Sequence, residues 1–274
     1  MSDRVEQKVI LHYERKKNMD VIIFSGQSNM CGETEAVPQI NFCVENAYEY
    51  RYEGNCLQPL QHPVGEDLFF GQLEGSDKKR GSLVPAFCRA YTQYSKRNVV
   101  AVHVACGSTT ITEWIKGTSR HFYMNQKINA AIQKVKENYT IDHIYFVWLQ
   151  GESDAIIQTS ETLYLERLKY HKDILKNEFG IEKFAIIKVG YFALNAGWIE
   201  DGSTEKKQWD EVIMQAQEHA VLEDEDFVML TRICPELSLK NEYINPNVAG
   251  HYTNEGLDII GAEAGKTLAL LGNV

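Results

Sequence analysis

DVIIFSGQSNM, residues 20–30, joins a short apolar run to a polar turn that presents one serine. The run from Val21 to Phe24 is continuous and β-branched, which is typical of a buried parallel strand. Gly26 relieves crowding where the chain leaves the sheet, so Ser28 follows the carboxyl end of that strand. Ligands of open α/β sheets bind at this end, and the stretch therefore indicates a nucleophile. The alternative is a serine that merely caps a helix or forms a turn.

This turn differs from the G-x-S-x-G elbow of α/β-hydrolases, because Met30 occupies the position of the second glycine. A different hydrolase design is implied.

Strand-like and helix-like segments alternate along the 274 residues without a low-complexity linker, which predicts one α/β domain over residues 19–274. Residues 1–18 are charged and weakly periodic, and we expect a peripheral arm there. Residues 31–79 are irregular, with one candidate strand at 47–52, and are expected to form loops over the active face. We expect five parallel strands, at 21–24, 99–105, 144–149, 184–189 and 227–230. Helices are expected after Ser82 and at 125–138, 161–178, 207–222 and 254–271.

Composition narrows the classes of function. The formal net charge of −10 argues against a nucleic-acid partner, which would need a basic stripe. No apolar run approaches the roughly 20 residues that span a bilayer, and the charged N-terminus does not resemble a signal peptide, so we expect a cytoplasmic protein without a membrane partner. The six cysteines lack C-x-x-C spacing and are expected to be free thiols. Among them Cys106 is an alternative nucleophile, although no base is adjacent to it.

VACGSTT, residues 104–110, is a second strand that runs into small residues. Gly107 allows the main chain to approach a ligand and to direct its N–H at a developing oxyanion, or else it simply forms a turn. Trp114, a few residues later, either packs in the core or forms a wall of a substrate pocket.

FVWLQGESD, residues 146–154, ends an apolar strand abruptly at an amide and two carboxylates. Carboxylates are seldom buried without partners, so their position at the carboxyl end of a core strand points to function. Gln150 could donate its amide N–H to an oxyanion, and Glu152 could orient a histidine. Asp154 could contact substrate or could cap the helix that follows.

NPNVAGHYTNEG, residues 245–256, leads into the last predicted helix and carries the candidate base, His251. Imidazole titrates near neutral pH, so it can take a proton from Ser28 and return it to a leaving alcohol. None of the other seven histidines has a metal-ligand spacing to a second histidine or cysteine, and we expect neither metal nor cofactor.

Together, the blocks GQSNM (26–30), GST (107–109), QGESD (150–154) and His251 resemble those of the SGNH-hydrolase superfamily, and more narrowly its carbohydrate-acetylesterase branch of acetylxylan esterases and sialate O-acetylesterases. The resemblance implies a three-layer α/β/α flavodoxin-like fold and a metal-free serine esterase acting on sugar acetates. It implies Ser28 as nucleophile, His251 as base, and an oxyanion hole from the N–H groups of Ser28 and Gly107 with the Gln150 amide. We expect Gln27, Trp114 and Asp154 to contact substrate.

The chain departs from this pattern at one position. Many SGNH enzymes carry an aspartate three residues before the histidine, where this chain has Val248, which cannot orient an imidazole. Some relatives use the glutamate of the QGE block, so Glu152 is the predicted third member of a triad. The alternatives are Asp154 as the orienting acid, or a Ser28–His251 dyad in which a backbone carbonyl of the loop from Pro246 to Gly250 holds the ring. The expected substrate is an acetylated xylo-oligosaccharide or related small acetyl ester. The alternatives are a sialate O-acetylesterase, a catalytically silent sugar-binding protein, and a lipase or thioesterase; the sequence leaves a homo-oligomer open.

Overall fold

The computed structural model describes residues 16–38, 43–65, 80–196 and 203–271. The expected arm lies mostly outside these ranges, in residues 1–15. Its last two residues, Lys17 and Asn18, do not belong to an arm, because they begin strand β1 and pair with Tyr139 and Thr140.

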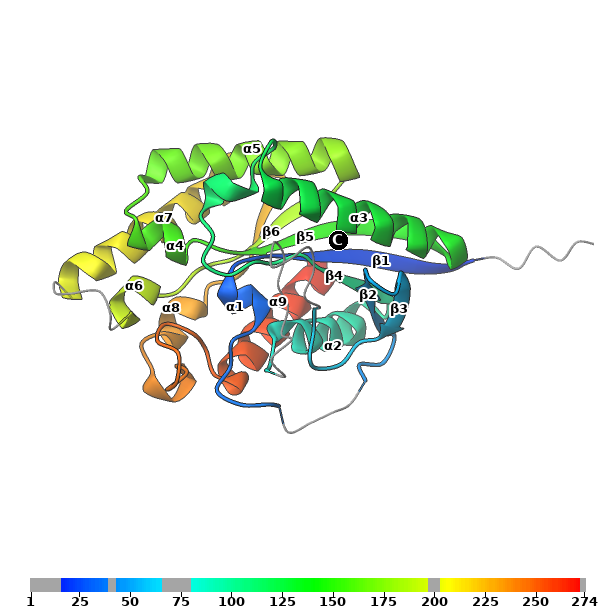
Figure 1. The fold of residues 1–274 in the computed structure, drawn as a ribbon, viewed down its shortest axis with the longest axis horizontal. Coiled ribbons are helices and arrows are strands. Elements are labelled where there is room, and N and C mark those ends of the chain that lie inside the picture. Colours follow the sequence, from blue (N-terminus) through cyan, green and yellow to red (C-terminus); the bar gives the residue numbers. More distant parts are fainter. Residues whose placement is uncertain (1–15, 39–42, 66–79, 197–202, 272–274) are drawn as a thin grey trace, which may run out of the picture.

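A single seven-stranded sheet forms the centre of the described chain (Figure 1). Its strands are β1 (Lys17–Gly26), β2 (Ala47–Arg51), β3 (Cys56–Pro59), β4 (Val99–His103), β5 (Tyr139–Leu149), β6 (Lys183–Ile187) and β7 (Phe227–Thr231). The expected count of five was too low, because β2 joins β4 in parallel and β3 adds an antiparallel edge through a hairpin. All five predicted strands are present.

The spatial order is β3-β2-β4-β1-β5-β6-β7. The five predicted strands alone therefore follow a flavodoxin-like order, with the first strand in the middle. The chain leaves β1 for β4 on one side and later returns to β5 on the other side. This reversal opens a crevice at the carboxyl end of β1, where ligands of such sheets bind.

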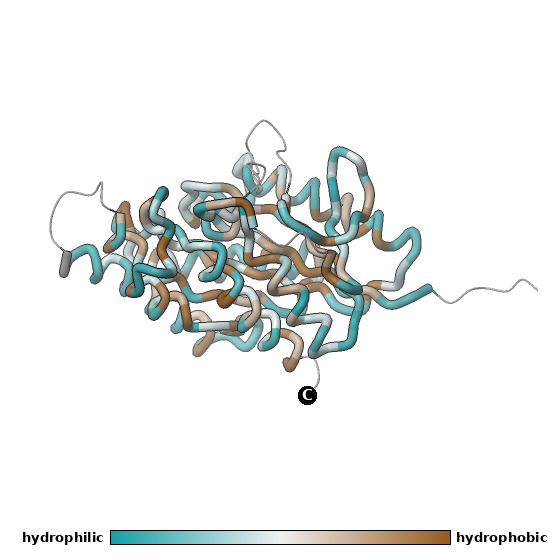
Figure 2. Tube along the Cα trace, turned by 90° about the horizontal axis from the view of Figure 1, so that it is seen from below, coloured by the Kyte–Doolittle hydropathy of each residue, from teal (hydrophilic) through white to brown (hydrophobic). Residues whose placement is uncertain are grey.

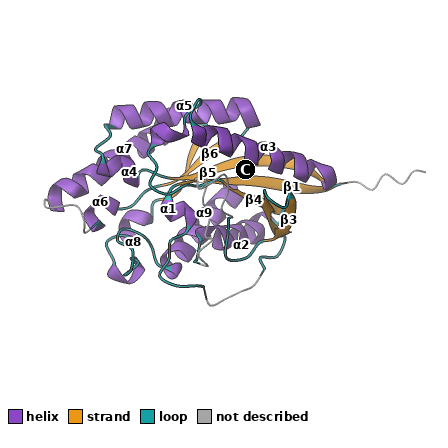
Figure 3. Ribbon diagram, viewed as in Figure 1, coloured by secondary structure: helices purple, strands orange, loops and turns teal. Residues whose placement is uncertain are grey.

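Helices cover both faces of the sheet (Figures 1 and 3). On one face α2 (Leu83–Ser95) packs against α9 (Asn254–Leu271), and on the other α3 (Ser119–Asn138), α5 (Glu161–Phe179) and α7 (Ser203–Glu223) form the second layer. Ser82 caps α2 by accepting a hydrogen bond from the Val84 N–H, and Gly180 ends α5 in the left-handed conformation, as the sequence predicted.

Four short helices lie at the carboxyl edge of the strands: α1 (Ser28–Cys31), α4 (Glu152–Ile156), α6 (Phe192–Asn195) and α8 (Cys234–Leu237). In Figure 2 the hydrophobic segments, coloured brown, gather in the interior of the molecule. They include an aromatic cluster of Phe146, Trp148 and Phe184 that surrounds the buried ring of His171.

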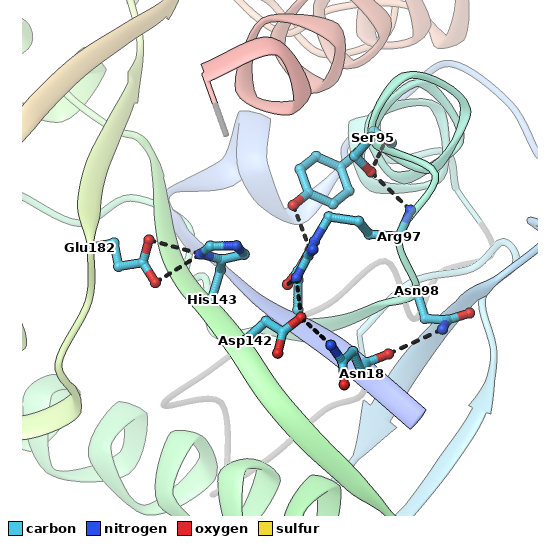
Figure 4. A network of polar contacts seen from close by, with 9 residues as sticks. Asn18, Ser95, Arg97, Asn98, Asp142, His143 and Glu182 are labelled. Carbon is cyan, nitrogen blue, oxygen red and sulfur yellow. Dashed lines mark hydrogen bonds and ion pairs between the residues drawn. The ribbon is translucent and has the colours of Figure 1, made fainter. Parts of the chain in front are cut away.

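The opposite edge of the sheet is held by a polar network around Arg97 (Figure 4). Arg97 donates from Nε and Nη2 to the two oxygens of Asp20, at 2.6 and 2.8 Å, and Tyr91 donates its hydroxyl to the same carboxylate at 2.7 Å. Arg97 also pairs with Asp142. Because these residues come from β1, α2 and β5, the network ties three elements together and compensates the fully buried charge of Asp20.

No helix within the described ranges combines the length and apolar character needed to cross a membrane. The six cysteines are free thiols, as predicted.

Candidate active site

The nucleophile turn is shaped by close contact between β1 and the end of β5. The Gln27 N–H donates to the Leu149 carbonyl at 3.0 Å, and a Cβ added at Gly26 would lie 1.9 Å from the same oxygen. Only glycine fits there, also because its φ is 145°. The chain then turns directly into α1, whose first residue is Ser28. The Ser28 N–H has no acceptor within that helix because it belongs to the first turn.

His251 lies beside Ser28, with 2.7 Å between Nε2 and the serine Oγ. The other ring nitrogen, Nδ1, lies 3.0 Å from the carbonyl oxygen of Ala249. A carbonyl can only accept, so Nδ1 carries the hydrogen and Nε2 has the lone pair that faces the serine hydroxyl. This tautomer is the one that a general base requires.

The imidazole is also held from its other side. Phe192 of α6 packs edge-on against the ring, with 5.4 Å between centroids. Burial lowers the pKa of His251, while the charge of Glu33 raises it and that of Arg80 lowers it further. The ring is therefore held in its neutral form at neutral pH.

Glu152 does not orient this histidine in the structure, and the predicted contact is wrong. Its Oε1 accepts a hydrogen bond from Asn29 Nδ2 at 2.9 Å, while the ring nitrogen that it was expected to contact faces Ala249. The Glu152 side chain is buried, and its Oε2 has no hydrogen-bond partner among the described residues. Burial raises the pKa of Glu152 to about 7.

Gln150 is not available as an oxyanion donor, contrary to expectation. Its side-chain amide donates to the Thr109 carbonyl at 2.8 Å and to Asp154 Oδ2 at 2.6 Å, so its two N–H bonds already have acceptors. Its side chain is fully buried behind the nucleophile turn. Gly107 does line the site together with Ser28.

The catalytic pair opens into a cavity of about 870 Å³. Its described lining combines polar groups, an apolar side and one carboxylate: Gln27, Ser28, Glu33, Gly107, Ser108, Thr110, Ser153, Ile156, Ile157, Phe192, Asn247, Val248, Ala249 and His251. This volume is in the range of sites for small ligands. Of the three expected substrate contacts, Gln27 lies in the wall.

Trp114 and Asp154 do not reach this cavity, and both expectations are corrected. Trp114 is fully buried, packs edge-on against Trp148 and donates from Nε1 to Thr109 Oγ1. Asp154 is almost fully buried and accepts from the Ile111 N–H, from Gln150 and from Thr159. Both side chains fix the loops behind the site.

Sequence reasoning missed three contributors to the site: Asn29, Glu33 and Phe192. Asn29 and Glu33 stand in or just after the GQSNM block, so their position next to Ser28 was a usable signal. Phe192 left no such signal, because it acts through packing. The Ala249 carbonyl lies in the loop from Pro246 to Gly250, whose backbone was the alternative partner for the ring.

A serine hydroxyl that faces a neutral imidazole, next to backbone N–H groups and an open cavity, can carry out acyl transfer. Within the described residues, no three histidine, cysteine, aspartate or glutamate side chains are grouped so that they could hold a metal ion.

Comparison with known proteins gives one family and several solved structures. The family model described as carbohydrate esterase, sialic acid-specific acetylesterase, matches residues 18–251. A protein of Arabidopsis thaliana of known structure is similar, at 18% identity and a TM-score of 0.67, over 93% of this chain and 98% of that one. A carbohydrate acetylesterase from Xanthomonas citri matches at 14% identity and a TM-score of 0.50, over 92% of this chain and 56% of that one. No curated protein sequence matches.

Proposed function

Because the chain belongs to the carbohydrate esterase family of sialic acid-specific acetylesterases, within the SGNH hydrolases, we propose that it removes O-acetyl groups from neutral carbohydrates such as acetylated xylo-oligosaccharides. The observation that carries the proposal is the 2.7 Å contact between His251 Nε2 and Ser28 Oγ in an open cavity. We propose that residues 17–274 act as one domain, since β1 begins at Lys17.

In the proposed mechanism, Ser28 Oγ attacks the acetyl carbonyl carbon while His251 Nε2 takes the hydroxyl proton. The N–H groups of Ser28 and Gly107 stabilise the oxyanion. The tetrahedral intermediate collapses, and His251 returns the proton to the departing sugar oxygen, which leaves an acetyl-serine. Water then attacks this ester while His251 Nε2 takes its proton; the bond between Ser28 Oγ and the acyl carbon breaks, His251 returns the proton to Ser28 Oγ, and acetate leaves.

Ala249 is the partner that orients the base in this mechanism. Its carbonyl dipole fixes the Nδ1–H tautomer and favours the imidazolium that forms during attack. We therefore propose a Ser28–His251 dyad with a backbone acceptor instead of a triad with a carboxylate.

The preference for neutral sugars rests on the charge of the cavity. The described lining includes the carboxylate of Glu33 and no lysine or arginine, so a sialate carboxylate would be repelled rather than paired. Ser108, Thr110 and Asn247 offer hydrogen bonds to hydroxyl groups, and the ring of Phe192 offers an apolar surface for a sugar face.

The decisive experiment is Ser28→Ala, tested for acetate release from acetylated xylo-, manno- and sialo-oligosaccharides. We expect a folded protein with less than about a tenth of wild-type turnover, because the variant loses the hydroxyl that contacts His251 Nε2. Ser160→Ala, which changes the exposed N-cap serine of α5 outside the described cavity lining, is the control and should keep its activity.

A fluorophosphonate should add its phosphonyl group to Ser28 in the wild type and not in the variant. Labelling at Cys106 instead would indicate a thiol enzyme. A wild-type protein that binds sugars but releases no acetate would be the catalytically silent alternative, and faster hydrolysis of sialate acetates than of neutral ones would overturn the charge argument.

A further inference from the structure

We propose that Glu152 is a positioning residue, which holds the Ser28 turn and the His251 loop in register through the side chain of Asn29. The proposal deepens the esterase mechanism given above and depends on it. It gives the buried carboxylate a role that does not require contact with the imidazole.

Asn29 connects the two halves of the catalytic pair. Its Nδ2 donates to Glu152 Oε1 at 2.9 Å, and its Oδ1 accepts from the Tyr252 N–H at 3.4 Å. Asn29 follows Ser28 in the chain and Tyr252 follows His251. A single buried amide therefore links the residue after the nucleophile to the residue after the base.

The carboxylate decides which way this amide points. Glu152 Oε1 is an acceptor, so the NH₂ group of Asn29 must face it, and the amide oxygen is left for the Tyr252 N–H. Without that acceptor, rotation of the amide by 180° would set its NH₂ group against the Tyr252 N–H. The hydrogen bond from the Tyr252 N–H to Asn29 Oδ1 is long, at 3.4 Å, and would be lost first. Its geometry therefore depends on the shorter bond from Asn29 to Glu152, at 2.9 Å.

Glu152 is itself fixed by the turn that starts α4. Gly151 has a φ of 149°, and a Cβ there would lie 2.6 Å from Ile213 Cγ2. The side-chain oxygen of Gln27 accepts from the N–H groups of Gly151 and Ser153, at 3.4 and 3.2 Å. Gln27 and Asn29, which flank Ser28, are thus both hydrogen-bonded to the segment from Gly151 to Ser153.

Burial raises the pKa of Glu152 to about 7, with the charge of Asp210 adding to the effect and the hydrogen bond from Asn29 opposing it. The carboxyl group can therefore carry a proton near neutral pH, on the oxygen that lacks a partner among the described residues. Oε1 accepts from Asn29 in either state, so the bridge does not require a charge.

Because the bridge does not require a charged carboxylate, the variant Glu152→Gln distinguishes a positioning role of Glu152 from direct participation in a triad. A triad acid that becomes an amide costs roughly 10⁴-fold in turnover. In the bridge, Glu152→Gln keeps the acceptor oxygen and puts an NH₂ group where the protonated acid has its hydroxyl, so we expect activity within about threefold of wild type. Asn29→Ala and Glu152→Ala remove the bridge, and we expect losses of about tenfold to 100-fold, the scale of a misplaced catalytic group.

A reciprocal exchange gives the sharpest test. Asn29→Asp sets two carboxyl groups against each other and should lose activity like Asn29→Ala. Combined with Glu152→Gln, the new glutamine can donate to the new aspartate, whose second oxygen still accepts from the Tyr252 N–H. The double variant should recover to within about tenfold of wild type, although each position has changed.

Two readouts apply to every variant: the rate at which a fluorophosphonate labels Ser28, and the pH profile of kcat/KM for an acetyl ester. The profile of Glu152→Gln should keep its acid limb at the wild-type pH, because the partner of the ring is Ala249. Circular dichroism and urea unfolding check that each variant is folded. If Glu152→Ala does not fold, Asn29→Asp alone and combined with Glu152→Gln take its place in the test.

A folded Glu152→Gln that loses more than about 100-fold would overturn the proposal in favour of direct action on the ring. Full activity of Asn29→Ala, or no recovery in the double variant, would also overturn it. A wild-type protein that neither reacts with the fluorophosphonate nor hydrolyses acetyl esters would instead refute the proposed function.

Discussion

Glu33 and Arg80 act on His251 with opposite signs. They form an ion pair with 3.5 Å between Nη1 and Oε2, and Glu33 also lines the cavity. The carboxylate raises the pKa of the imidazole and the guanidinium lowers it. Burial is the larger influence on this pKa, and since the neutral ring is the proposed base, the two side chains shift the lower end of the working pH range in opposite directions.

We predict that Glu33→Gln moves the acid limb of kcat/KM to lower pH. Removing the carboxylate removes a negative charge that stabilises the imidazolium, so the pKa of His251 falls. Activity then persists further into the acidic range. The measurement is a pH profile with a neutral acetyl ester at constant ionic strength.

Arg80→Gln is the matched variant and should move the same limb in the opposite direction, to higher pH. Shifts of equal sign in both variants would mean that the limb does not report the His251 pKa. Removing an exposed carboxylate elsewhere, as in Glu236→Gln, should leave the limb in place.

The pairing of Ser28 with His251 was predictable at the residue scale because the proposed chemistry is tied to residue type. Ser28 ends a buried strand and His251 stands in a loop before the last helix, and the structure brings their side chains together. The acceptor for Nδ1 was predictable only as an alternative, a backbone carbonyl in the loop from Pro246 to Gly250, since any residue supplies a carbonyl and Ala249 has no distinguishing side chain. Sequence position also does not give side-chain direction: Gln150, Trp114 and Asp154 follow core strands yet point inward to buried partners.

At the scale of elements, periodicity was sufficient for the long helices and for the five strands β1, β4, β5, β6 and β7. Each of these buries an apolar face or run, so its pattern is imposed by the core. The strand β3 was missed because Cys56–Pro59 is half exposed, only four residues long and stabilised mainly by its hairpin partner β2. Such an edge strand has little hydrophobic pattern of its own.

The short helix α6 is an element whose position depends on one carboxylate. Asp210, buried on α7, accepts hydrogen bonds from the N–H groups of Ala193 and Leu194 at 3.0 and 3.1 Å. These N–H groups belong to the first turn of α6 and have no acceptor within the helix. The same helix carries Phe192, whose ring packs against His251.

We predict that Asp210→Ala lowers the free energy of unfolding by about 2 kcal/mol, because two buried N–H groups lose their acceptors. The rate of fluorophosphonate labelling at Ser28 should fall as well, since Phe192 no longer holds the imidazole. Urea unfolding and labelling kinetics are the measurements. Gln215→Ala, which changes an exposed side chain of α7, is the control and should change stability by less than about 0.5 kcal/mol. If Asp210→Ala is destabilised but labels at an unchanged rate, the position of α6 does not affect His251.

At the scale of the whole molecule, the two edges of the sheet have different roles. The edge at the amino ends of the strands is closed by the Asp20–Arg97–Asp142 network, in which charges neutralise one another and join three elements (Figure 4). The edge at the carboxyl ends carries the cavity and the short helices (Figure 1). The charges of this network thus lie at the opposite edge from the site, where the side chains of Glu152 and His251 are buried and shifted in pKa.

The aromatic cluster in the core makes the stability of the whole fold depend on pH. His171 is fully buried among Phe146, Trp148 and Phe184, and neither ring nitrogen has a hydrogen-bond partner among the described residues. Burial lowers its pKa from 6.5 to about 3. Between these values the unfolded chain binds a proton that the native protein does not, so stability falls as the pH drops below 6.5.

We therefore predict that His171→Phe makes the protein less sensitive to acid. Above pH 6.5 the imidazole is neutral in both states and contributes no pH dependence, whereas at pH 5 its protonation in the unfolded chain costs the wild type about 2 kcal/mol. Urea unfolding of both proteins at pH 7 and pH 5 measures this difference directly, because every other titrating group is common to the two and cancels. The difference in unfolding free energy between variant and wild type should grow by about 2 kcal/mol on acidification. A difference that stays constant would mean that the native protein protonates His171 as readily as the unfolded chain does, which would require water to reach the ring inside the aromatic cluster.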